Sequence, residues 1–171
     1  FGIDNIRAAL PHVREGTIPN MRQLSENVQL SNENPAKQVE VTLGVSEEES
    51  KIDVNINVVE EDPERINLTL DNTGTRANGK HRIGLSYQHA NVANRDQVVT
   101  LGYSTVLDAP QGVKVDIFSI GYRLPLYEIG DSIDVIYGNS SSNTPASVIA
   151  PGGTLAINGK GIVGGLRYNH I

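Results

Sequence analysis

Three short segments carry the pattern that decides the fold: residues 66–71 read INLTLD, residues 82–88 read RIGLSYQ and residues 99–104 read VTLGYS. In each segment, apolar residues occupy every second position, and polar or small residues fill the positions between them. Successive side chains of a β-strand point to opposite faces of a sheet. The alternation therefore predicts strands that have one apolar face and one polar face.

The composition of the polar face bears on where such a sheet would lie. It consists mainly of Gly, Ser, Thr, Asn and Gln with single charges, and the apolar face carries Tyr near its ends. Both traits are typical of a membrane barrel, which has lipid outside, a polar lumen and aromatic residues near the interfaces. A soluble β-sandwich with one solvated face alternates in the same way. Periodicity alone leaves both interpretations open.

The bulk properties narrow the class of protein. A chain of 171 residues holds one medium domain or two small ones, and its formal charge of -6 argues against nucleic acid as a partner. No apolar run approaches the roughly 20 residues of a membrane helix, so entry into a bilayer would require strands. The absence of Cys excludes disulfides and thiolate metal sites. The chain begins at Phe1 without a signal peptide and ends in mid-pattern, so we expect a piece of a longer protein.

Two helices are predicted near the start of the chain, where apolar residues lie three or four positions apart. The first is expected to begin at Asp4, as its N-cap, and to end at Pro11. The second is expected to begin at Pro19 and to stop before Asn34.

Two strands are predicted next, at residues 38–43 and 51–59, because the spacing of apolar residues changes to strict alternation. The order helix, helix, strand, strand predicts a layer of helices packed on a hairpin, with a domain boundary near Pro63. The apolar residues expected to meet in this layer are Val39, Val41, Leu43, Ile52, Val54, Ile56 and Val58 on the strands and Met21, Leu24 and Val28 on the helix.

From residue 63 onward the sequence predicts about six strands separated by turns. The apolar positions of residues 113–124 change phase at Ile117 and Phe118, so we expect a β-bulge or a break there. Residues 140–158 are rich in Ser, Pro, Gly and Asn and are predicted to form a loop. A last strand is expected at residues 161–168.

Several motifs resemble the TpsB family, the outer-membrane transporters of two-partner secretion that export haemagglutinins, haemolysins and adhesins. Residues 24–59, which contain NENPA at 32–36 and a hairpin with an acidic turn, resemble the second POTRA domain of that family. LDNTGT at 70–75 resembles its first barrel hairpin, and GYRLPL at 121–126 with YGNS at 137–140 resembles the next.

This resemblance implies an α+β, mainly antiparallel β fold. Residues 1–62 would form a POTRA domain without its first strand, and residues 63–171 would form the first strands of a transmembrane β-barrel. The family has two POTRA domains, a plug helix and a sixteen-stranded barrel, and the chain departs from it by truncation. We therefore expect the isolated chain to self-associate.

The function implied by the resemblance is protein export. A POTRA domain in the periplasm of a Gram-negative bacterium would capture an unfolded, secreted TpsA-type exoprotein, and the barrel, surrounded by outer-membrane lipid, would pass it outward. No cofactor and no nucleic acid are implied, and no enzyme activity. Two alternatives stay open: an insertase of the same superfamily that folds other barrels, and a soluble β-rich binding module.

Two sets of site residues follow from the resemblance and the predicted faces. An exposed edge of the hairpin could bind substrate by β-augmentation, although an ordinary edge strand has the same sequence pattern. Charged residues on the polar face could line a pore or only brace the lumen. The edge residues are Gln38, Val39, Glu40, Val41, Thr42 and Leu43, and the pore-lining candidates are Arg82, Lys114, Asp116 and Arg123.

No catalytic or metal site is predicted from the remaining polar residues. The four His residues are scattered without ligand spacing, and the acidic runs at 47–49 and 60–62 are typical of solvated turns. No Ser lies in a nucleophile motif with convincing His and Asp partners.

Overall fold

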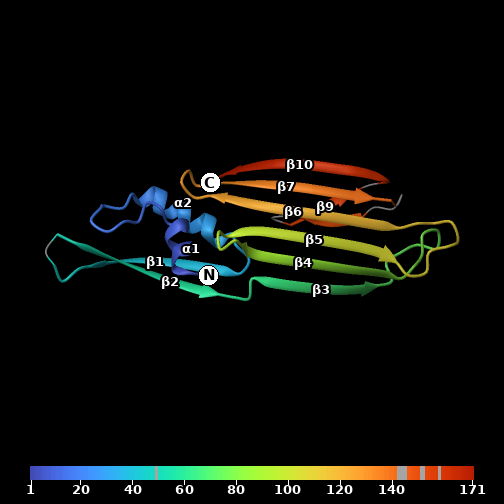
Figure 1. The fold of residues 1–171 in the computed structure, drawn as a ribbon, viewed down its shortest axis with the longest axis horizontal. Helices are drawn as coiled ribbons and strands as arrows, with labels where there is room; N and C mark the ends of the chain where they lie inside the picture. Colours follow the sequence, from blue (N-terminus) through green and yellow to red (C-terminus); the bar gives the residue numbers. More distant parts are fainter. Residues whose placement is uncertain (49, 142–145, 151–152, 158) are drawn as a thin grey trace.

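The computed structural model describes residues 1–48, 50–141, 146–150, 153–157 and 159–171. Its helices are α1 (Ile3–Ala9) and α2 (Met21–Asn32), and its strands are β1 (Lys37–Val45), β2 (Ile52–Glu60), β3 (Glu64–Asp71), β4 (Arg82–Val92), β5 (Gln97–Val106), β6 (Asp116–Leu126), β7 (Asp131–Ser140), β8 (Ala146–Ala150), β9 (Gly153–Ile157) and β10 (Gly161–His170). The hairpin β1–β2 precedes an antiparallel sheet in the order β10-β7-β6-β5-β4-β3, and β8 pairs with β9 (Figure 1). The predicted α+β architecture, a partial POTRA layer followed by barrel strands, is confirmed.

The two helices begin differently from the prediction. Asn20 caps α2, because its side-chain oxygen accepts hydrogen bonds from the backbone N–H of Arg22 (3.1 Å) and of Gln23 (3.4 Å). The N-cap of α1 is Gly2, without a side-chain bond, so the expected cap by Asp4 is wrong. Asp4 lies in the first turn instead, where its negative charge suits the helix dipole.

The helices cover only the part of the hairpin that lies near the large sheet. Leu10, Leu24 and Val39 form a buried cluster. The residues that pack around it are Ile6, Val13, Val28, Val41 and Val58. The other end of the hairpin projects beyond the helices (Figure 1). The expected packing is therefore confirmed near Val39 and wrong for Met21, Leu43, Ile52 and Ile56, whose side chains are exposed.

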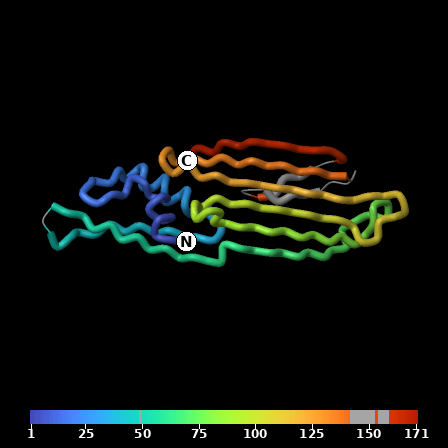
Figure 2. The backbone as a smooth tube through the Cα atoms, in the orientation of Figure 1, coloured from blue at the N-terminus to red at the C-terminus, as the bar shows by residue number. Residues whose placement is uncertain are grey.

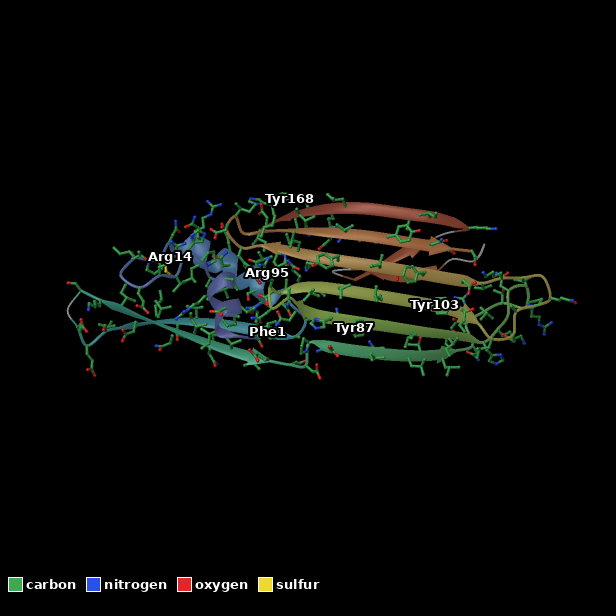
Figure 3. The ribbon with its side chains drawn as sticks, in the orientation of Figure 1. Phe1, Arg14, Tyr87, Arg95, Tyr103 and Tyr168 are labelled. Atoms are coloured by element: carbon green, nitrogen blue, oxygen red, sulfur yellow. The ribbon has the colours of Figure 1, made fainter. Side chains whose placement is uncertain are left out.

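The six-stranded sheet exposes its apolar face. Its polar face is buried along much of the middle strands β5, β6 and β7, whereas both faces of the edge strands β3 and β10 are largely exposed. Leu68 in β3 is 64 % exposed, whereas Ser132 in β7 is 1 % exposed. Five Tyr residues, three of them visible in Figure 3, share the parity of the apolar face: Tyr87, Tyr103, Tyr122, Tyr137 and Tyr168. A soluble sheet would bury the apolar face, so this facing is that of a membrane barrel.

The hairpin β8–β9 corrects the loop predicted for residues 140–158. Ser140 ends β7, and β8 and β9 pair from residue 146 to residue 157; residues 142–145, 151–152 and 158 lie outside the described residues. β8 lies against β6 and β5 rather than extending either of the other two sheets. The segments ASVIA and GTLAI each hold enough β-branched and apolar residues for a short strand.

The bulge predicted in the fourth strand of the barrel is absent. β6 pairs with β5 and β7 without a shift in register, with Ser104 opposite Ile117 and Tyr103 opposite Phe118. Ile117 is 6 % exposed and Phe118 is 43 % exposed, so the two side chains point to opposite faces. Ile117 is thus a buried apolar residue on the polar face of β6, and β8 lies against β6. A register shift does occur in β4, between His89 and Val92.

The two ends of the large sheet have connections of different length. At the end next to the helices, residues 93–96 and 127–130 form short turns. At the far end, residues 72–81 and 107–115 form longer loops, as the tube in Figure 2 shows. Neither of the two helices is long and apolar enough to cross a membrane, in so far as the chain is described.

Candidate functional site

A buried ion pair joins the helix and hairpin layer to the large sheet. The side chain of Lys37 is 0 % exposed and that of Asp96 is 1 % exposed. The Lys37 Nζ donates to the Asp96 carboxylate and to Asn5 Oδ1 (3.1 Å), and it lies 5.2 Å from the centre of the Phe1 ring. Burial lowers the pKa of Lys37, while the charge of Asp96 opposes that shift. The ammonium group is thus held away from water with its charge matched by one carboxylate.

Asp96 gathers side chains from three elements. Asn5 in α1 donates to Asp96 Oδ1 (2.9 Å), and the Tyr127 hydroxyl, which follows β6, donates to Asp96 Oδ2 (2.6 Å). Burial, together with the negative charge of Asp96, raises the pKa of Tyr127 well above its usual value. We call Asn5, Lys37, Asp96 and Tyr127 the junction cluster.

The turn that carries Asp96 has an unusual backbone. Ala93, Asn94 and Asp96 have positive φ angles of 54°, 56° and 58°. That region is costly for residues other than Gly. The turn is held by the Asn91 side chain, which accepts from the Asp96 N–H (3.2 Å), and by Asn5, which donates to the Asn94 carbonyl (3.0 Å). Contacts from α1 therefore fix the conformation of a turn of the barrel.

A second set of contacts ties the end of α2 to the strands. Arg123 in β6 donates through two nitrogens to Asp134 in β7 (2.8 and 3.1 Å) and through the third to Glu33 (3.0 Å). The side chain of Asn34 donates to the Ala90 carbonyl (2.7 Å). Paired Arg–carboxylate bonds of this kind fix direction as well as distance. The hairpin layer is thus oriented against the sheet at two places.

The free edge of β1 is capped at one residue. Asn32 accepts a hydrogen bond from the Val39 N–H (2.6 Å) and donates one to the Val39 carbonyl (3.0 Å). Its carboxamide thus makes the two bonds that a neighbouring strand would make. Both polar backbone groups of Val39 therefore point away from β2.

This geometry fixes which backbone groups the rest of the edge presents. In an antiparallel pair, successive residues alternate between bonding the partner strand and pointing away from it. The pairing of β1 with β2 is regular from Lys37 to Val45, so Val41 and Leu43 share the orientation of Val39. In the described part of the chain, β1 pairs with β2 alone, so the outward N–H and C=O groups of Val41 and Leu43 have no strand beside them.

The sequence-predicted edge residues are therefore brought together, but they are not equivalent. The side chain of Val39 is buried and that of Val41 is half-buried. The other four side chains are exposed: Gln38, Glu40, Thr42 and Leu43. The backbones of Gln38, Glu40 and Thr42 face β2, and that of Val39 is occupied by Asn32. Val41 and Leu43 remain as the candidate contacts for an added strand.

The pore-lining candidates are divided by the structure. Arg82 and Arg123 lie on the polar face, where Arg82 is opposite Asp71 and Arg123 is opposite Asp134. Asp116, predicted on this face, lies on the apolar one, because β6 has no bulge; it accepts a hydrogen bond from the Tyr103 hydroxyl (2.7 Å).

Lys114, predicted to line the pore with Asp116, likewise lies off the polar face. It precedes β6 in the loop, and its Nζ is 3.2 Å from the Asp116 carboxylate. The pair therefore marks the far end of the apolar face.

Sequence reasoning missed the junction cluster. Lys37 and Asp96 lie 59 positions apart, and neither belongs to a motif that indicates its partner. Tyr127 is the one Tyr of the chain outside the apolar alternation of the strands, which is the signal that could have identified it. The described residues contain no group of three His, Cys, Asp or Glu side chains that could hold a metal ion.

Comparison with known proteins assigns the family. The sequence profile described as haemolysin secretion/activation protein ShlB/FhaC/HecB matches residues 50–170. The chain belongs to this family. It is a family of TpsB outer-membrane transporters of Gram-negative bacteria, with POTRA domains in the periplasm, so the resemblance seen in the sequence is confirmed.

A solved structure supports the fold of this ShlB/FhaC/HecB member. CdiB from Escherichia coli is similar with a TM-score of 0.64 and 16% sequence identity, over 89% of this chain and 27% of the CdiB chain. The chain thus spans about a quarter of that relative. No curated protein matches the sequence.

Proposed function

We propose that this chain is the part of a two-partner secretion transporter that receives an exoprotein in the periplasm and delivers it to the barrel. In this proposal, residues 1–62 form the POTRA domain and residues 63–171 contribute strands to the transmembrane barrel. The partner is a secreted TpsA-type exoprotein in an extended, unfolded form. Family membership and the inverted facing of the large sheet support the proposal.

The observation that carries the capture step is the outward backbone of Val41 and Leu43. An extended peptide can add to such an edge through main-chain hydrogen bonds, largely independently of its sequence. This suits a transporter that must hold many successive segments of one long substrate. Asn32 would stop the added strand at Val39, so the substrate would lie along the part of β1 that points away from the junction.

Export would then follow the polar face of the sheet. Arg82 is our candidate for a residue that lines the path, because it lies on that face near the far end of β4. Arg123 is hydrogen-bonded to Asp134 and Glu33, so we propose that it holds the end of α2 against the strands rather than lining the path. A fixed junction would keep the binding edge in one orientation relative to the lumen.

Leu43→Pro in the full-length transporter tests the capture step. Proline lacks the N–H that Leu43 would offer to a substrate strand, and it is tolerated at strand edges. The side chain of Leu43 is exposed, so its loss should cost the POTRA core little. We expect Leu43→Pro to reduce the amount of exoprotein in the medium severalfold, and Leu43→Ala to leave it near the level of the parent protein.

Thr42→Pro is the matched control for backbone damage. It removes an N–H that bonds β2, so it should loosen the hairpin and increase protease cleavage, whereas Leu43→Pro should not. Equal secretion by Leu43→Pro and Leu43→Ala would reject strand addition at this edge.

The alternatives are less well supported. A soluble binding module would bury the apolar residues that are exposed here, Leu68 and Leu166 among them. An insertase of other barrels would share the fold, but the family assignment favours export.

A further inference from the structure

A cavity of about 620 Å³ lies where α1 meets the ends of β5 and β6. Ala8 of α1 and Gln97 of β5 form part of its wall. Leu124 and Leu126 of β6 line it as well, and both share the parity of Phe118 on the apolar face. The lipid-facing surface of the barrel therefore continues into this cavity.

Polar residues at the same end of the apolar face indicate how deep in the membrane the cavity lies. His89 lies 3.7 Å from Glu64 at the ends of β4 and β3, and His170 lies 2.6 Å from Asp131 at the ends of β10 and β7. Gln97, between these pairs in the strand order, lines the cavity itself. A barrel strand crosses the bilayer in about 9–11 residues, and β6 runs 11 residues from Asp116 to Leu126. The cavity thus lies at the periplasmic boundary of the membrane.

Two opposite charges line the cavity at this level. Arg95 and Glu128 are both exposed, and neither is in an ion pair with any described residue. Figure 3 shows Arg95 where the helices meet the strands. The third charged residue of the wall, Asp96, is already matched by Lys37.

We propose that this cavity binds one zwitterionic phospholipid of the periplasmic leaflet, with a phosphatidylethanolamine headgroup. The phosphate accepts hydrogen bonds from Arg95, the ammonium donates to Glu128, and an acyl chain lies along Leu124 and Leu126. Arg and phosphate form strong charge-assisted hydrogen bonds. The site requires only the membrane location of the barrel and is independent of substrate capture by β1.

The pairing of charges selects among headgroups. An anionic phosphatidylglycerol satisfies Arg95 but leaves Glu128 without a cation. A phosphatidylcholine carries a cation without N–H donors, so it cannot hydrogen-bond the Glu128 carboxylate. The bound lipid would also join α1 to β6, because Ala8 and Leu124 line the same cavity.

Native mass spectrometry of the full-length transporter in detergent tests this assignment. Phosphatidylethanolamine, phosphatidylglycerol and phosphatidylcholine with identical acyl chains would be titrated separately. We expect the parent protein to retain phosphatidylethanolamine best. Arg95→Gln should weaken that binding about tenfold, which is the effect of losing one hydrogen bond between charged groups.

The variants separate a built site from lipid that coats the barrel nonspecifically. Glu128→Gln should abolish the preference for phosphatidylethanolamine over phosphatidylglycerol. Arg14→Gln, an exposed arginine outside the cavity whose Nε is bonded to the Pro11 carbonyl, should bind all three lipids as the parent does. Equal retention of the three lipids by the parent, tighter binding of phosphatidylglycerol, or unchanged binding by Arg95→Gln would each overturn the proposal.

Discussion

At the scale of single residues, the junction cluster fixes one way of docking the POTRA layer on the barrel. A buried ion pair gains little net stability, because both charges lose their hydration. Its geometry is demanding, however, since each alternative arrangement would leave a charge buried and unmatched. The main effect of Lys37 and Asp96 is therefore to select one orientation of the POTRA layer on the barrel. Their contribution to the stability of that contact is small.

Asp96→Asn tests how strongly the docked arrangement depends on the ion pair. It leaves the Lys37 ammonium buried without a carboxylate, and the loss of one partner of a buried pair costs about 3–5 kcal/mol. We expect the POTRA layer to become accessible to protease at a lower urea concentration in the full-length protein.

The double variant Lys37→Met with Asp96→Asn is the control for this experiment. It removes both charges, so it should recover much of the lost protection. If the double variant lost as much stability as Asp96→Asn and Lys37→Met lose together as single variants, the two charges would not be coupled.

Tyr127 should make the junction sensitive to alkaline pH. Its pKa is raised in the folded state, so above its ordinary value of about 10 the docked form holds a proton that the undocked form loses. Docking should therefore weaken as pH rises past 10. The lowered pKa of Lys37 acts in the opposite direction, because there the undocked form binds the extra proton.

Tyr127→Phe removes the first effect and keeps the second. We expect this variant to be less stable than the parent at pH 8, through the lost bond to Asp96, but to lose less stability between pH 9 and 11. Protease protection measured across that range checks the prediction. Parallel pH curves for the two proteins would contradict it.

At the scale of elements, alternation predicted most of the strands because each has one apolar face. That face turns toward the helices in part of β1 and β2, and it is exposed in the large sheet. Alternation failed at Ile117, where an apolar residue on the polar face mimics a change of phase. The cause is β8–β9, whose position against β6 cannot be known from the sequence of β6. The hydrogen bonds of Asn32 to the Val39 backbone were not predicted for a related reason. The sequence around an amide at the end of a helix does not show which residue it will bond.

The facing of the sheet predicts how charges will be tolerated. Leu85 and Ser86 are neighbours on β4, and Leu85 lies on the exposed apolar face. Leu85→Arg places a charge in the lipid, at a cost of about 2–4 kcal/mol near the midplane. We expect it to reduce the amount of folded barrel in the outer membrane, as judged by heat-modifiable migration in gels.

Ser86→Arg is the matched control, since it places the same charge on the polar face. It should assemble better than Leu85→Arg. Gly102 is unsuitable for this purpose, because a Cβ there would lie 2.6 Å from Ser119 Oγ. Equal assembly of the two Arg variants would mean that the two faces are assigned the wrong way round.

At the scale of the whole molecule, the sheet of the 171-residue chain is open. Among the described strands, β3 and β10 each pair on one side only, and the apolar face is exposed. Unpaired strand edges recruit further strands. We expect this chain to form large assemblies when it is prepared without detergent. Light scattering would detect them. A stable monomer would contradict the open edges.

The unequal connections at the two ends of the sheet have a consequence for the living cell. The short turns lie beside the POTRA layer and so face the periplasm, which puts the long loops on the outer surface. We therefore expect residues 107–115 to be accessible from outside the cell, and Arg95 and the junction cluster to lie on the periplasmic side. We expect an epitope inserted beside Gly112, whose own φ of 84° disfavours any other residue at that position, to be read by antibody on an intact bacterium.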